Sequence, residues 1–294
     1  MRRAGIEPIL KMMRRVFLGI FLFLIIQPVI AQVDPAVETS WTSSVDWSQG
    51  VLELTAERPI DRSGANVPAA AHRTERQISR ELPSALVDAL IPLRIDSRRT
   101  LGDLLREDPE IYTAIEALST EVERRVTRPD PALRRLRVRY RLPLFPHLPS
   151  ILGTEELLLP LRRPLGWSPS TEYTGIVIYA AEPLPIHGTD ILSRPVPALK
   201  PEIFDESMRE VLSEQQVERE WLLKWGTAAS SEELDLSSFV ERIGEKPKRI
   251  LARRLFGIAP TDFVISNRDA EGILSNPANR ALLREGRILV IIGD

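Results

Sequence analysis

Arginine at every second position of one segment is the pattern in this chain with the clearest chemical consequence. The four residues are Arg135, Arg137, Arg139 and Arg141. Apolar residues occupy the positions between them. In an extended strand, residues two apart point to the same face and lie about 7 Å from one another. Residues 133–144 are therefore predicted to form a strand with one apolar face and one face of guanidinium groups.

Two interpretations of this arginine row remain open. Guanidinium forks suit phosphate and carboxylate, so the row is a candidate site for an anionic ligand or an acidic partner surface. Alternatively, the arginines pair across the sheet with acidic residues such as Glu53 and Glu57 on an earlier strand. We favour the internal pairing, because arginine is the preferred cation of this chain in general. After residue 31 the sequence has 30 arginines and 4 lysines.

Histidine and cysteine offer little further chemistry. His72, His147 and His187 are not spaced as zinc ligands, and cysteine is absent. His187 together with Asp190 and Asp205 is a conceivable base or ligand set, but we favour a polar loop histidine. The sequence has no nucleophile elbow, phosphate-binding loop or dinucleotide fingerprint. We therefore expect a non-enzymatic protein without a metal or a cofactor.

Hydropathy patterns in the first half predict strands alternating with capped helices. Alternating apolar residues predict a strand over 51–57, and a four-residue apolar repeat predicts a helix over 68–91 that kinks or splits at Pro83. A short strand is expected at 93–95. Thr100 with Asp103 forms a capping-box pattern, and Asp108 before a proline predicts a further helix through about Glu123.

The second half begins with an apolar run at 173–181 that predicts a central strand. A proline-punctuated connection follows through residue 201, and residues 207–225 are ambiguous, with a strand possible at 210–212. Further strands are expected at 248–255, 262–266 and 287–292, with a helix from Ser266 to Arg284 that Pro277 interrupts. The order predicts an α+β fold with mixed or antiparallel sheets and segregated helices. The expected division is a loose lead-in (32–46), a first unit (47–150), a proline-rich connection (151–171) and a second unit (172–294).

The N-terminal 31 residues resemble a secretory signal. Arg14 and Arg15 precede an uncharged apolar stretch at 16–26, and Pro28 and Ala31 complete a cleavage pattern that predicts a cut between Ala31 and Gln32. The apolar stretch is shorter than the roughly 20 residues of a spanning helix. We expect an exported protein, periplasmic or attached to the envelope, without a stable membrane span after cleavage.

Details of the leader stay open. Translation starts at Met1, Met12 or Met13, and the shorter forms give a more compact signal. No cysteine follows the apolar stretch, so a lipid anchor by that route is not expected. The whole chain of 294 residues has a formal charge of −2, and removal of residues 1–31 brings it to −6. That sign argues against nucleic acid as a partner.

Several segments resemble a group of exported bacterial proteins. A threonine–glycine pair before an apolar strand (residues 173–178) and a P-x-x-x-P-x-I-x-D pattern (residues 197–205) are two of them. Residues 262–270 and 282–290 resemble a further block of the same proteins. The strand, helix and segment 93–100 of the first half are similar to the small α+β domain of flagellar-motility-associated envelope lipoproteins. The resemblance implies structural or assembly proteins and brings no catalytic residues.

Three functions follow as expectations, in order of preference. The first is an exported, non-catalytic envelope protein that acts through contacts with envelope or surface-assembly proteins, in motility or surface-structure assembly. The alternative is a periplasmic binding module for an anionic ligand, which uses the arginine row. A hydrolase comes third, because it requires a cleft centred on carboxylates or on His187 that a single sequence does not reveal.

Overall fold

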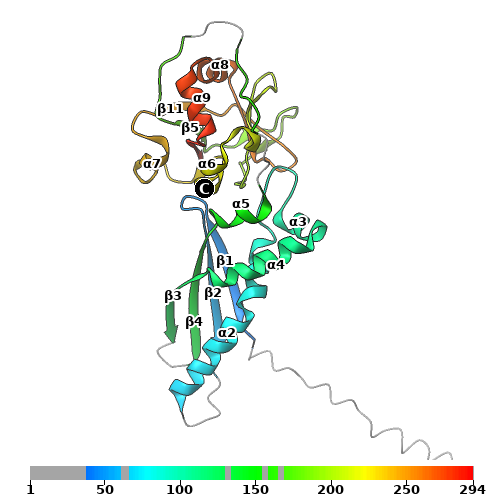
Figure 1. Ribbon diagram of the computed structural model, residues 1–294, viewed down its shortest axis with the longest axis vertical. Coiled ribbons are helices and arrows are strands. Elements are labelled where there is room, and N and C mark those ends of the chain that lie inside the picture. The colour runs from blue at the N-terminus through cyan, green and yellow to red at the C-terminus, as the bar shows by residue number, and fades with distance from the viewer. Residues whose placement is uncertain (1–37, 61–65, 130–133, 154–157, 165–168, 294) are drawn as a thin grey trace, which may run out of the picture. The chain divides into compact units, whose positions relative to one another are not determined.

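The computed structural model describes residues 38–60, 66–129, 134–153, 158–164 and 169–293. The signal peptide, its cleavage between Ala31 and Gln32, and the start of the lead-in lie outside these residues. Among the helices that the structure describes, none combines the length and the apolar character needed to cross a membrane. Two α+β portions make up the described chain, as the sequence predicts, and Figure 1 shows their elements.

The first portion is an antiparallel sheet with the strand order β1-β2-β4-β3. Its strands are β1 (Ser40–Asp46), β2 (Val51–Pro59), β3 (Glu123–Pro129) and β4 (Arg135–Pro143). Strands β2 and β4 lie in the middle and bury the apolar face that the alternating sequence predicts, including Leu52, Leu54 and Val138. The other face of β4 carries the arginines.

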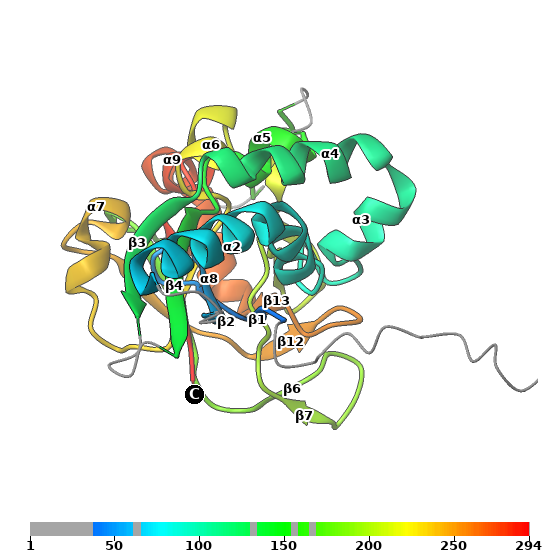
Figure 2. The same cartoon turned by 90° about the horizontal axis from the view of Figure 1, so that it is seen from below.

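Helix α2 packs against the apolar face of this sheet, and α4 lies alongside α2 (Figures 1 and 2). The helical elements are α2 (Val67–Leu90), α3 (Leu101–Glu107), α4 (Pro109–Ala117), the 3-10 turn η2 (Leu118–Thr120) and α5 (His147–Leu152). The Asn66 side chain caps α2, and the predicted capping box between Thr100 and Asp103 starts α3. Helix α2 continues through Pro83 as one element, so of the expected kink or split, the split does not occur.

Two strands of this sheet differ from the sequence prediction. Residues 40–46, expected as part of a loose lead-in, form β1, because Trp41 and Val45 lie on the sheet's apolar side while pairing with β2 orders the serines and threonines between them. The helix expected to reach Glu123 ends at Ala117, and Glu123 instead begins β3. Backbone pairing with β4 outweighs the weak strand pattern of this charged segment.

The second portion contains a parallel sheet with the order β10-β14-β5-β11. Its strands are β5 (Ile176–Ala180), β10 (Ala229–Ser231), β11 (Lys248–Leu251) and β14 (Ile288–Ile292). Both faces of β5 and β14 are buried: Ile178 and Val290 face one apolar cluster, and Val177 and Leu289 face another. This two-sided burial explains the continuous apolar runs that predict central strands.

A third sheet has the order β12-β13-β8-β9 and combines parallel and antiparallel pairs. Its strands are β8 (Ile203–Asp205), β9 (Glu210–Leu212), β12 (Arg254–Phe256) and β13 (Asp262–Ile265). The hairpin of β6 (Leu184–Pro185) and β7 (Leu192–Ser193) is best seen in Figure 2. The expected strand at 248–255 is divided between β11 and β12.

The helices of the second portion are short. They are η3 (Glu214–Gln216), α6 (Arg219–Trp225), η4 (Ser237–Phe239), α7 (Val240–Ile243), α8 (Asn267–Ser275) and α9 (Pro277–Arg284). Ser266 caps α8, and Pro277 begins α9, so the interruption expected at this proline is confirmed. Residues of the two portions also contact each other, since the amides of Leu199 and Lys200 donate to the carbonyls of Arg94 and Ile95.

Candidate functional site

The two edges of the first sheet differ in how their backbone is protected. Strand β3 has an irregular register between Arg124 and Val126, and it ends in Pro129. Bulges, prolines and basic side chains are the usual features that prevent further strands from adding to an edge. Strand β1 pairs with β2 without a register shift, and its seven residues include no proline, lysine or arginine. Its outer edge is therefore suited to pair with another extended segment.

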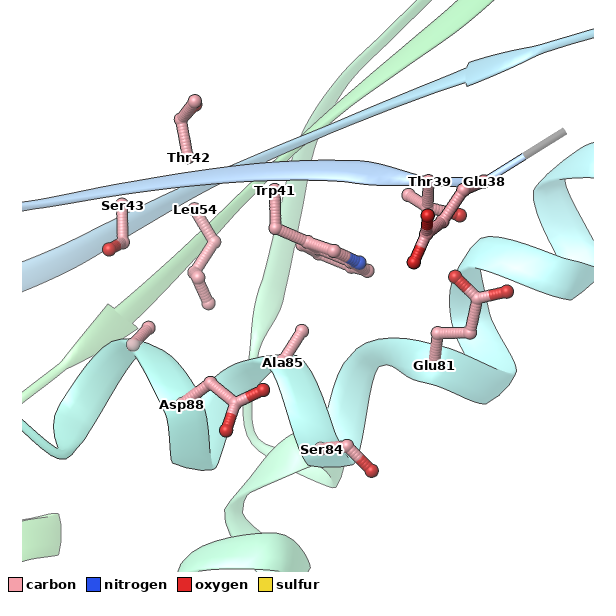
Figure 3. A pocket seen from close by; sticks show the side chains of 11 residues that line it. Glu38, Thr39, Trp41, Thr42, Ser43, Leu54, Glu81, Ser84, Ala85 and Asp88 are labelled. Atoms are coloured by element: carbon pink, nitrogen blue, oxygen red, sulfur yellow. The ribbon is translucent and has the colours of Figure 1, made fainter. Parts of the chain in front are cut away.

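A groove runs beside this open edge, between β1 and α2, with a volume of about 470 Å³ (Figure 3). We call it the β1–α2 groove. Trp41 and Leu54 line it from the sheet, and Ala85 lines it from the helix. The Trp41 ring stacks on Tyr140, with ring centroids 6.2 Å apart, so its position is fixed from within the core.

Small side chains leave the groove open. On the side of β1 that faces α2, Ser43 stands between Trp41 and Val45. Opposite it, α2 presents Ala85 and Ala89 to the groove. Larger residues at these positions would fill the space between strand and helix, as the leucines of β2 and α2 do deeper in the core.

Acidic side chains surround the groove. Glu38, Glu81 and Asp88 belong to its lining, and Figure 3 shows the Glu81 and Asp88 carboxylates on α2, about two turns apart. Arg58, which is 9% exposed, donates from Nη1 to Glu81 Oε1 at 2.6 Å and to Thr39 Oγ1 at 2.7 Å. Within the described part of the chain, Glu38 and Asp88 form no ion pair. The groove thus has an excess of negative charge.

Arg58 also positions the strand. It lies at the end of the buried row of β2, and its two hydrogen bonds join the residue before β1 to the middle of α2. A guanidinium held by a carboxylate and a hydroxyl at short distance is rigid. The spacing between β1 and α2 at this end of the groove is therefore set by side-chain hydrogen bonds as well as by packing.

The predicted arginine row lies on the opposite face of the same sheet. Arg135, Arg137 and Arg139 are exposed and Arg141 is partly buried. The register places Glu57 opposite Arg137 and Glu53 opposite Arg141, as the internal-pairing interpretation expects. Arg137 Nη2 lies 3.3 Å from Glu57 Oε1.

The other two arginines have neutral cross-strand neighbours on β2. Thr55 stands opposite Arg139, and Pro59 stands opposite Arg135. The row is thus a partly compensated charged face rather than four converging guanidinium groups, since strand geometry spaces them evenly.

The histidines do not form the set considered from sequence. His187 contacts the ring of Phe256, whereas the fully buried carboxylate of Asp205 is bound by Arg162 at 2.9 Å and by Arg209 at 2.8 Å. Asp190 is exposed in the β6–β7 turn. In the ranges that the structure describes, no group of three or more potential ligands is arranged to hold a metal ion.

Sequence reasoning missed the groove residues. Trp41 falls within the expected loose lead-in at 32–46, and Asp88 falls within the predicted helix at 68–91, where no pattern distinguishes it. The absence of proline, lysine and arginine from residues 40–46 was a usable signal for an open edge, but only once those residues were known to be a strand.

Comparison with known proteins supports the division into two portions. Residues 38–151 match the family model described as Treponema pallidum Tp0624, N-terminal domain, and residues 175–294 match the model of its second domain. No curated protein matches the chain. The expected likeness to flagellar-motility-associated envelope lipoproteins finds no support in these matches. Over both matched segments, and in the same order, the chain is similar to the first two domains of Treponema pallidum Tp0624.

Proposed function

We propose that this chain is an exported, non-catalytic envelope protein that binds an extended segment of a partner protein along β1. The observation that carries the proposal is an unprotected edge strand beside an acidic groove. Export rests on the N-terminal sequence pattern. The proposal leaves out motility, because the matching family models give it no basis.

The geometry supplies the two elements of strand addition. Main-chain hydrogen bonds to the free edge of β1 give affinity without regard to sequence, and the groove receives every second side chain of the added strand. Glu38 and Asp88 favour a basic side chain in the groove, while the Trp41 ring offers it an aromatic surface. The proposed partner segment is extended and carries lysine or arginine at one of its alternate positions.

The alternative proposal, an anionic ligand on the arginine row, has one observation in its favour. Arg139 is exposed and has a threonine rather than a carboxylate opposite it on β2. The ion pair at Arg137 weakens this alternative, because Glu57 already occupies that guanidinium.

Selection from a random library of displayed ten-residue peptides tests the main proposal. The expected result is enrichment of peptides that combine β-branched residues with lysine or arginine at alternate positions. Their binding should be lost in Asp88→Lys and retained in Asp190→Lys, which places the same charge in the exposed β6–β7 turn.

Two results would count against the proposal. One is that no peptide is enriched. The other is that the enriched peptides bind Asp88→Lys as well as they bind the unaltered chain, which would place their site outside the groove.

A further inference from the structure

Two carboxylates of the third sheet lie side by side, and neither belongs to the β1–α2 groove. Ile203 on β8 pairs with Phe263 on β13 in parallel register, so the preceding residues, Glu202 and Asp262, are also neighbours. The Phe263 amide donates to the Glu202 carbonyl, and the Glu202 amide donates to Asp262 Oδ1 at 3.2 Å. Like charges next to each other across a sheet are destabilising, so this arrangement needs an explanation.

Both carboxylates line a pocket of about 1140 Å³, which we call the carboxylate pocket. Asp262 is 1% exposed; Thr261 Oγ1 donates to its Oδ1 at 2.9 Å and the Ser97 hydroxyl lies close to the carboxylate, while Oδ2 is buried without a partner in hydrogen-bonding geometry among the described residues. His187, also in the lining, has a buried Nδ1 without a partner in the same residues. The Glu202 side chain forms neither a hydrogen bond nor an ion pair there.

These are three groups able to accept hydrogen bonds in one cavity. A carboxylate only accepts, and the histidine Nδ1 accepts when the ring proton is on Nε2. Buried acceptors without donors destabilise the folded chain. A bound group with several N–H donors and a positive charge would satisfy all three, and a protonated primary amine has three such donors.

One side of the pocket is apolar, and the rest of the lining includes the polar residues Asp96, Ser97, Arg98 and Arg99. Phe204 and Phe256 meet edge to face, with ring centroids 5.3 Å apart, and Ile186 adds to the same lining. Ile258, which is 86% exposed, also belongs to the lining. Aromatic faces attract cations, and the exposed isoleucine provides apolar surface for the body of a ligand.

A loop from the first portion completes the pocket. Ser97 accepts a hydrogen bond from the Ala259 amide, and Gly257, with a φ of +106°, allows the β12–β13 turn to approach Ser97 closely. In this loop Arg99 is paired with Asp96 at 2.8 Å. The pocket therefore lies between residues of the two matched domains, a common location for ligand sites.

Charge and burial affect the protonation of the pair. Burial, with the nearby carboxylates of Asp262, Glu210 and Asp96, raises the pKa of Glu202 to about 7, and Arg98 opposes this effect. Burial also raises the pKa of Asp262. A cation placed between them would favour the ionised form of both.

We propose that the carboxylate pocket binds an organic cation: a primary amine with an apolar or aromatic body. The ammonium group lies against Asp262, Glu202 and His187, and the body lies on the two phenylalanine rings. This site is independent of peptide binding in the β1–α2 groove.

Calorimetric titration of the purified chain with 2-phenylethylamine tests the proposal, with the neutral 2-phenylethanol as the matched probe. The amine should bind in a saturable manner at pH 8 and about tenfold more weakly at pH 6, because Glu202 must lose its proton to pair with the ammonium. The alcohol should not bind measurably.

Variants separate this site from any other. Glu202→Gln should weaken amine binding and remove its dependence on pH, whereas Glu182→Gln, an exposed residue of the same portion, should change neither. Asp262→Asn should abolish binding of the amine. The far-ultraviolet circular dichroism spectrum of this variant reports whether the protein is folded. The proposal is overturned if the alcohol binds as well as the amine, or if Glu202→Gln keeps the pH dependence.

Discussion

The two edges of the first sheet are built from similar lengths of chain, yet they present opposite surfaces. Strand β3 has an irregular register, basic residues and a terminal proline, while β1 is regular and free of all three. An acidic groove also lies beside β1. The difference indicates that protection against strand addition has been placed at one edge and omitted at the other, which is expected where pairing is a function.

The largest effect is expected from removing the side chain that joins β1 to α2. Arg58→Met should lower the free energy of unfolding by about 2 kcal/mol, because Glu81 and Thr39 both lose a hydrogen bond to a charged donor. Urea unfolding measures the change. Arg137→Met, which removes an exposed ion pair, is the control and should cost no more than about 0.5 kcal/mol. Equal losses of unfolding free energy in the two variants would show that the hydrogen bonds of Arg58 contribute no more than an exposed ion pair.

Reversal of charge in the groove should affect binding more than stability. Asp88 is exposed on α2, so Asp88→Lys should fold normally. It should weaken the binding of a selected basic peptide by at least about tenfold, or about 1.4 kcal/mol. Fluorescence anisotropy of a labelled peptide measures the constant. An unchanged dissociation constant would show that the peptide does not bind in the groove.

The basic character of β3 can also be introduced into β1. Ser43→Lys places a cation on the groove side of the open edge, within the lining that includes Asp88. Peptide affinity should fall several-fold, since inward-pointing charges protect edges. Fluorescence anisotropy of the same labelled peptide measures the dissociation constant. Ser48→Lys, in the turn after β1, is the matched control; an equal loss there would indicate general charge repulsion.

The smallest effect is expected on the arginine face. The double variant Arg137→Gln, Arg139→Gln should lose no more than about 1 kcal/mol, because exposed pairs contribute little. If the internal pairing accounts for the row, added phosphate should change the melting temperature of the chain and of the double variant equally. A phosphate-dependent rise that disappears in the variant would instead favour the anion-binding alternative.

Sequence patterns predict those helices and strands that are marked by residues close together in the sequence. Strands β5 and β14 are continuous apolar runs, and the ends of α8 and α9 are marked by Ser266 and Pro277. Strand β1 was missed because only Trp41 and Val45 of its seven residues are large and apolar. Its structure depends on pairing with β2, which propensity does not express.

The sites depend on contacts between distant parts of the sequence. Ser43 and Ala85 border one groove because α2 packs on the sheet, and no local pattern records the missing volume between them. Glu202 and Asp262 become neighbours through the parallel pairing of β8 with β13. His187 was considered with Asp190 and Asp205, yet it lines the same pocket as the other two carboxylates. Sequence identified the residue, but not its neighbours.

Hydrogen exchange in the presence of the tightest selected peptide tests the central claim most directly. At saturation, the backbone amides of β1 that point away from β2 should become protected, while the amides of β3, at the other edge, should exchange as in the free protein. Protection that appears along β3, or a complex in which residues 40–46 exchange as before, would contradict strand addition at β1.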